Sequence, residues 1–116
     1  MIIQHIMKQY VIDELRPQDY RKLKTYLDDS YSSSVIGGIY WIALEDGILT
    51  DVQSAHRGCQ PHYFALDLNE DRLACELLVR TQARMRCSCM GYATETQRNW
   101  LIRLIDGMFG ELGIKT

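Results

Sequence analysis

The chain lacks most of the features that mark specialised protein classes. It has two prolines in 116 residues, and its only monotonous stretch is a run of three serines. None of its apolar runs approaches the ~20 residues that a membrane-spanning helix needs. Disordered and fibrous chains are rich in proline, glycine or charge, so this composition excludes both classes.

The chain also lacks a large excess of charge of either sign and a secretory signal. Its net charge is −2, which argues against a protein that binds nucleic acid or acidic lipid over its whole surface. The apolar residues of the first segment are interrupted by Gln4 and His5, and either Met1 or Met7 could be the start. We therefore expect a cytoplasmic protein that does not enter a membrane, with its four cysteines as reduced thiols.

Motifs of catalysis are missing as well. The sequence has no nucleophile elbow, no glycine-rich phosphate loop and no H-E-x-x-H zinc motif. A non-catalytic role is therefore favoured over an enzymatic one.

What the chain does contain is the pattern of one α+β domain over residues 1–116, a common size for a single domain. Pro17 suits the first turn of a helix, and Leu23 and Leu27 follow at helical spacing, which predicts a helix over about 17–30. Thr94 and Gln97 have the spacing of a capping box, which predicts a second helix over about 94–112. Its apolar stripe is Trp100, Leu101, Leu104, Ile105, Met108, Phe109 and Leu112.

Alternating apolar residues predict strands between these two helices. Residues 39–44 read as a buried strand, and residues 62–92 as a three-strand meander whose first loop is Asn69–Arg72. The register that keeps all apolar residues on one face pairs Leu68 with Leu73, Leu66 with Cys75 and Phe64 with Leu77. We predict an antiparallel sheet with the two helices on one face, preceded by a short edge strand within 8–15 and interrupted by an irregular connection at 48–61.

Histidine and cysteine in two segments raise the question of a metal. His56, Cys59 and His62 are spaced three apart, and Cys87 and Cys89 follow later in the chain; zinc favours such imidazole and thiolate ligands. A histidine beside Cys59 could also activate its thiol. The competing interpretation is that Cys75, Cys87 and Cys89 are small hydrophobes on the core face of the sheet. We favour that second interpretation and expect no cofactor, with zinc as the alternative.

Three arginines are predicted to point away from the core. Arg80, Arg84 and Arg86 would form a positive patch that binds a nucleic acid, another polyanion or an acidic protein. Alternatively, they belong to a solvated sheet face on which Glu76 pairs across strands with an arginine.

Strand 39–44 is apolar on both faces, although a one-sided sheet buries only one of them. The second face needs a cover, which another segment of the chain, a protein partner or a second copy could supply. Our first hypothesis is therefore a non-catalytic interaction module that binds a partner or itself through its sheet. The alternatives are a zinc-binding or thiol-dependent protein and a binder of anionic ligands.

Overall fold

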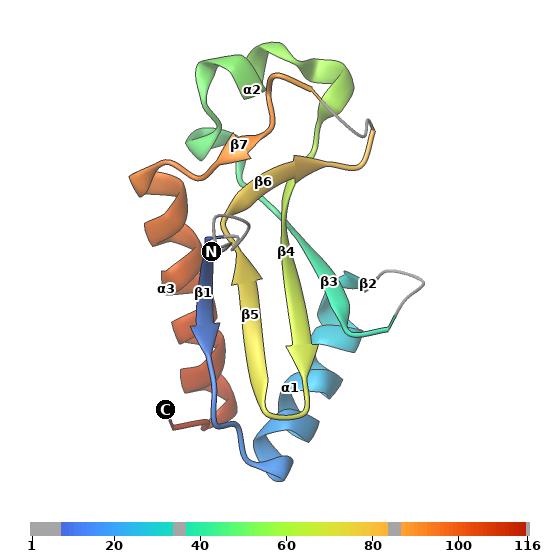
Figure 1. Ribbon diagram of the computed structural model, residues 1–116, viewed down its shortest axis with the longest axis vertical. Coiled ribbons are helices and arrows are strands. Elements are labelled where there is room, and N and C mark those ends of the chain that lie inside the picture. Colours follow the sequence, from blue (N-terminus) through green and yellow to red (C-terminus); the bar gives the residue numbers. More distant parts are fainter. Residues whose placement is uncertain (1–7, 34–36, 84–86, 116) are drawn as a thin grey trace, which may run out of the picture.

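The computed structural model describes residues 8–33, 37–83 and 87–115, and within them seven strands form an antiparallel sheet (Figure 1). The main order is β1 (Gln9–Ile12), β5 (Arg72–Glu76), β4 (His62–Asn69), β3 (Ile39–Ala43) and β2 (Ser32–Ser33). Beyond the end of β5, β6 (Leu78–Thr81) takes its place beside β4 and pairs in turn with β7 (Gly91–Tyr92). The long strand β4 is therefore common to both parts of the sheet.

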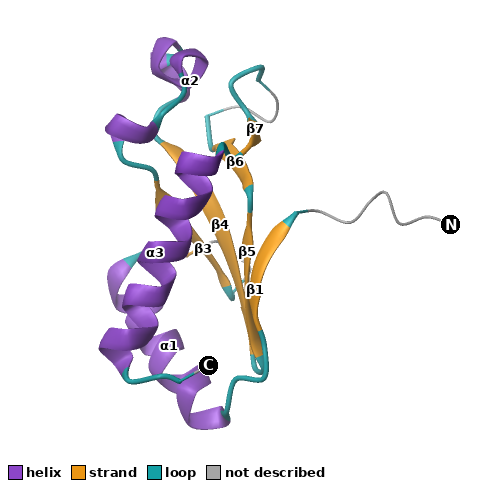
Figure 2. Ribbon diagram, turned by 90° about the vertical axis from the view of Figure 1, so that its left-hand side faces the viewer, coloured by secondary structure: helices purple, strands orange, loops and turns teal. Residues whose placement is uncertain are grey.

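Two long helices cover one face of this sheet (Figure 2). They are α1 (Pro17–Ser30) and α3 (Glu95–Leu112), and their positions confirm both predicted helices and the predicted α+β class. Proline begins α1, the Thr94–Gln97 capping box begins α3, and Gly113 ends α3 in the left-handed conformation. Burial of the facing side chains drives the packing. The fully buried aliphatic and aromatic residues of this core are Leu23, Leu27, Tyr40, Ile42, Phe64, Leu66, Leu73, Val79, Leu101 and Ile105.

The hairpin of β4 and β5 has the predicted register, with Leu66 opposite Cys75 and Leu68 opposite Leu73. Its loop is shorter than expected, because Asn69 and Arg72 pair with each other and leave a two-residue turn. Near this turn, the backbone of Gly38 lies close to that of Leu68 in β4. The φ angle of Gly38 is +93°, and a Cβ there would lie 3.0 Å from the carbonyl oxygen of Leu68. Glycine alone fits this position without strain.

The predicted pairing of Phe64 with Leu77 is not found, because β5 ends at Glu76. The N–H of Leu77 donates to the carbonyl oxygen of Lys8, and its own carbonyl accepts from the N–H of Ala93. When the chain rejoins β4, Tyr63 lies opposite Arg80, a shift of two residues. Because side chains alternate with a period of two, this shift leaves Val79 on the core face, where it is fully buried.

The third strand of the meander is β7, which is confined to residues 91–92. Cys87 and Cys89 were expected in a strand with their side chains on its core face; that expectation is wrong. They lie in a turn closed by a 3.0 Å hydrogen bond from the N–H of Met90 to the carbonyl of Cys87. Apolar residues at every second position do not identify a strand by themselves, because this spacing also occurs in turns.

The connection between β3 and β4 lies beyond the end of the sheet, around the short helix α2 (Asp51–Ala55) (Figure 1). Flanking 3₁₀ turns span Asp46–Ile48 and Arg57–Cys59. A second capping box, Thr50 with Gln53, begins α2. No helix in the described part of the chain is both long and apolar enough to cross a bilayer.

Candidate metal centre

Four side chains that the sequence separates by up to 33 positions converge at the end of the molecule near α2. The ring of His56 and the thiols of Cys59, Cys87 and Cys89 each offer one ligand atom, and these four atoms lie within 4.8 Å of one another. The Nδ1 atom of His56 is 3.0 Å from the sulfur of Cys87, which is 3.7 Å from the sulfur of Cys59. The structure thus joins the two segments that the zinc hypothesis proposed to combine.

Local backbone structure places two candidate ligands in each segment. His56 is the residue at which α2 ends, and the 3₁₀ turn that follows carries Cys59, whose N–H donates to the His56 carbonyl at 3.0 Å. In a 3₁₀ turn, side chains three apart lie one above the other. The turn at Cys87–Met90 brings the other two thiols to the same point.

The spacing of these atoms fits a tetrahedral metal ion. With Zn–S bonds of about 2.3 Å, two sulfur ligands of a tetrahedron lie about 3.8 Å apart. The Cys59–Cys87 distance of 3.7 Å matches that edge. A nitrogen and a sulfur ligand would lie about 3.6 Å apart. The His56–Cys87 contact of 3.0 Å is shorter than that edge and is a hydrogen-bond distance.

The thiols have different proton affinities. The backbone N–H of Cys89, with further hydrogen bonds from the Cys89 thiol, His56 and Cys59, lowers the pKa of Cys87 to about 6. Burial raises the pKa of Cys89 to about 12. The lowered pKa favours the thiolate form of Cys87, which is the form that would bind a cation. The other thiols lose their protons when a metal binds.

Burial is uneven across the four residues. Cys59 and Cys89 are buried, whereas His56 and Cys87 are partly exposed. A cation held between them would face the protein interior on one side and solvent on the other, which gives it an entry path.

The remaining histidine and cysteine of the sequence hypotheses lie outside this group. His62 begins β4 on its core side and is 1% exposed, and its ring nitrogens have no hydrogen-bond partner among the described residues. Burial lowers its pKa, as does the nearby His56. Cys75 is fully buried on β5, where burial raises the pKa of its thiol to about 12. Cys75 is thus the core hydrophobe that we expected.

The comparisons with known proteins give no lead. Neither a family model, nor a curated protein, nor a solved structure matches this chain significantly.

The predicted arginine patch is described only at Arg80. Its Nε lies 2.7 Å from Oε1 of Glu76, and a second nitrogen lies 3.4 Å from Oε2. The pair joins residues four apart along the β5–β6 segment rather than across strands, and it satisfies the Arg80 charge. Arg84 and Arg86 lie outside the described residues.

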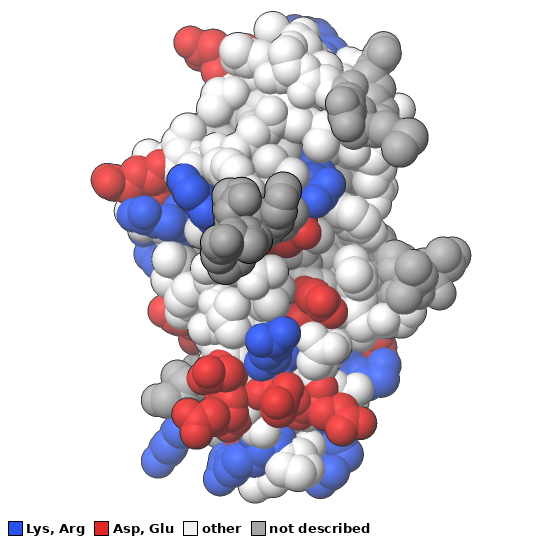
Figure 3. Space-filling model, in the orientation of Figure 1, with Lys and Arg blue, Asp and Glu red and all other residues white. Residues whose placement is uncertain are grey.

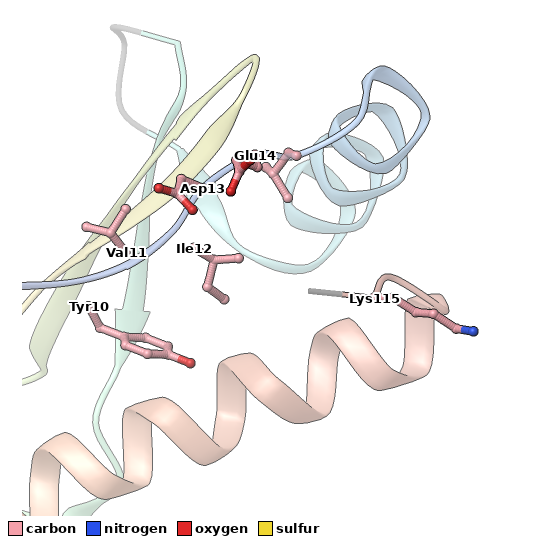
Figure 4. Close-up of a pocket in the computed structure, with 7 residues that line it drawn as sticks. Tyr10, Val11, Ile12, Asp13, Glu14 and Lys115 are labelled. Atoms are coloured by element: carbon pink, nitrogen blue, oxygen red, sulfur yellow. The ribbon is translucent and has the colours of Figure 1, made fainter.

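A hollow of about 470 Å³ lies at the other end of the sheet, where β1 leaves it (Figure 4). Asp13, Glu14 and Lys115 line it, and Tyr10 and Ile12 point from β1 toward α3. The Tyr10 hydroxyl donates to Oδ1 of Asp106 at 2.8 Å. These groups form no arrangement that predicts catalysis.

Two buried glutamines lie beside the four-residue cluster, and the sequence did not predict this: Gln53 was overlooked, and Gln97 had a capping role alone. Gln53 and Gln97 are 3% and 0% exposed, and their side-chain amides hydrogen-bond each other at 2.9 Å. The signal was available, since T-x-x-Q occurs at both 50–53 and 94–97. It predicts helix starts, but not that the two capping residues meet.

Proposed function

We propose that this protein is a zinc-binding domain in which His56, Cys59, Cys87 and Cys89 hold one Zn²⁺. The convergence of three thiols and one imidazole within 4.8 Å, from two distant segments, is the observation that carries this proposal. Tetrahedral sites rich in sulfur select zinc or iron–sulfur chemistry, and a single set of four ligands suits one zinc ion.

The proposed zinc is structural rather than catalytic. Four protein ligands complete a tetrahedron, whereas a catalytic zinc keeps one position for water or substrate. The ion would join the α2 connection to the β6–β7 connection. By cross-linking these two segments, metal binding would contribute folding free energy to this end of the molecule. A reducing compartment, as we expect for this chain, would keep the thiols available as ligands.

The competing interpretation treats the cysteines as core hydrophobes. It accounts for Cys75, which lies between β1 and β4 with a fully buried side chain. It accounts poorly for Cys87, which is partly exposed and contacts an imidazole. Three thiols meeting one histidine are better explained as a ligand set.

Elemental analysis of protein purified without a histidine tag tests the proposal. We expect about one zinc per chain, and a chelator should remove it and lower the melting temperature. Protein that folds without metal, binds no added Zn²⁺ and melts unchanged in chelator would overturn the proposal.

We also propose that the open face of the sheet is an interaction surface for a second copy of the chain or another protein. Trp41 and Tyr63 meet edge to face there, with ring centroids 6.0 Å apart, and Tyr92 is 47% exposed. Helices α1 and α3 both lie on the opposite face (Figure 2). Above the acidic belt at the lower end, most of the visible surface of this face is uncharged (Figure 3).

Light scattering across a concentration series tests this second proposal. The expected result is self-association, or retention of a co-purifying protein, that Trp41→Ser abolishes. Val52→Ser, which removes an exposed apolar residue from α2 instead, is the matched control. A wild-type chain that stays monomeric and captures no partner would contradict the proposal.

A further inference from the structure

A buried amide joins the two halves of the candidate metal centre. Nε2 of Gln53 donates to the carbonyl oxygen of Cys89 at 3.3 Å, in a buried contact. Gln53 belongs to α2, the helix that ends at His56. The segment that carries His56 and Cys59 is therefore tied to the turn that carries Cys87 and Cys89 by a hydrogen bond between protein groups.

The orientation of the Gln53 amide is determined by its other partners. Its Oε1 accepts from the N–H of Thr50 at 3.0 Å and from Nε2 of Gln97 at 2.9 Å. An amide oxygen has two lone pairs, so these two donors satisfy it and leave the NH₂ group facing Cys89. A flipped amide would place two donors against its NH₂ group and an oxygen against a carbonyl.

Gln97 is held equally firmly. Its Oε1 accepts from the N–H of Thr94 at 3.1 Å, and its Nε2 donates to the carbonyl of Ile48 at 2.9 Å as well as to Gln53. Each glutamine thus completes the capping box of its own helix. Gln53 also links α2 to Cys89, and Gln97 links α3 to Gln53. The chain of bonds runs from the start of α3, through α2, to the backbone of Cys89.

We infer that Gln53 and Gln97 are positioning residues for the metal centre, which hold the Cys87–Cys89 turn against the His56–Cys59 segment before metal binds. This inference rests on the proposed zinc site. Groups that orient metal ligands typically contribute about 10- to 100-fold to metal affinity. A purely structural role would stabilise the helices and leave the ligand geometry unchanged.

Gln53→Glu is the sharpest variant, because it keeps the side chain's shape and the oxygen that accepts from Thr50 and Gln97. It replaces only the NH₂ donor to Cys89 with an oxygen that repels the carbonyl. Gln60→Glu is the matched control: it adds the same charge one residue from Cys59, but its amide donates to the carbonyls of Gln53 and Ser54 rather than to Cys89.

Competition with a chromophoric chelator measures the Zn²⁺ dissociation constant of the full-length chain. We expect Gln53→Glu to weaken binding about 10- to 100-fold and Gln60→Glu to stay close to wild type. The visible ligand-field spectrum of bound Co²⁺, which reports ligand geometry, should change in Gln53→Glu only. If Gln53→Glu fails to fold, Gln97→Glu, which loses the donor that orients Gln53, should weaken binding in the same direction.

The outcomes separate the two proposals. Wild-type protein that binds zinc, with glutamine variants of unchanged affinity and Co²⁺ spectrum, would overturn the positioning role and leave the zinc site standing. Wild-type protein that binds no zinc would overturn both.

Discussion

The sulfur atoms of Cys59 and Cys87 lie 3.7 Å apart, although 28 positions separate the two residues in the chain. A disulfide would hold them about 2.05 Å apart, so the distance is that of two free thiols rather than of a bond. The contact joins two connections that lie beyond the main sheet.

Removing one ligand should remove the metal. Cys87→Ser is expected to bind no zinc, so a chelator should not change its melting temperature. For the wild-type chain, free zinc at 1,000 times the dissociation constant should raise the free energy of unfolding by about 4 kcal/mol. Metal analysis and thermal melts with and without chelator measure both effects. Cys75→Ala is the control, because it removes a core thiol and should lower stability while keeping about one zinc per chain. Zinc retained by Cys87→Ser would count against the four-ligand site.

Trp100 is expected to stabilise the packing of α3 on the sheet by stacking on Phe64. The ring centroids are 6.3 Å apart with an interplanar angle of 24°, but Trp100 is only partly buried. Trp100→Ala should therefore cost about 2–3 kcal/mol, less than the 3–5 kcal/mol of a fully buried tryptophan. Urea denaturation measures the loss. Trp100→Phe keeps an aromatic ring over Phe64 and should recover most of it; a loss in Trp100→Ala below about 1 kcal/mol would show that the stacking matters little.

Features set by local sequence were predictable. Both long helices combine an amphipathic stripe with a start signal, proline in one and a capping box in the other, and both occur at the predicted positions. The register of Leu66 with Cys75 followed from the need to keep one face apolar.

Features set by distant partners were not predictable. The strand breaks at Leu77 because Lys8 and Ala93 bond its backbone, and neither partner is marked in the sequence. Likewise, the spacing of His56 and Cys59 suggested a chelating loop, but their meeting with Cys87 and Cys89 depends on how two long connections fold. The same alternation that correctly placed Cys75 in the core wrongly placed Cys87 in a strand.

Arg80 should bind polyanions only when it is released from Glu76. Glu76→Gln removes the bidentate carboxylate, so it is expected to increase retention on a heparin column at low salt relative to wild type. Because both side chains of the ion pair are partly exposed, Glu76→Gln should lower the free energy of unfolding by about 1 kcal/mol or less. The double variant Glu76→Gln with Arg80→Gln should return to wild-type retention. Equal retention of wild type and Glu76→Gln would show that the ion pair does not limit anion binding.

We expect that His62 is not needed for zinc binding and that it lowers the stability of the fold at low pH. Its ring nitrogens find no partner among the described residues, so His62→Leu removes a buried, unpaired polar group. The variant should keep about one zinc per chain and be at least as stable as wild type at pH 7. Zinc lost from His62→Leu would instead make His62 a ligand and contradict the four-residue site.

The pH dependence of the same variant supplies an independent check. Burial, and then His56, lower the pKa of His62 in the folded state, while the unfolded chain takes up that proton near pH 6.5. Below about pH 6.5 the unfolded state therefore binds more protons at this position, and wild type loses stability as the pH falls, by at most about 1.4 kcal/mol per pH unit. His62→Leu lacks this loss. Both proteins carry the same four proposed metal ligands, so acid release of zinc contributes almost equally to their two unfolding free energies. The difference should favour the variant increasingly between pH 6.5 and pH 5, and a difference that stays constant over this range would show that His62 is protonated equally in both states.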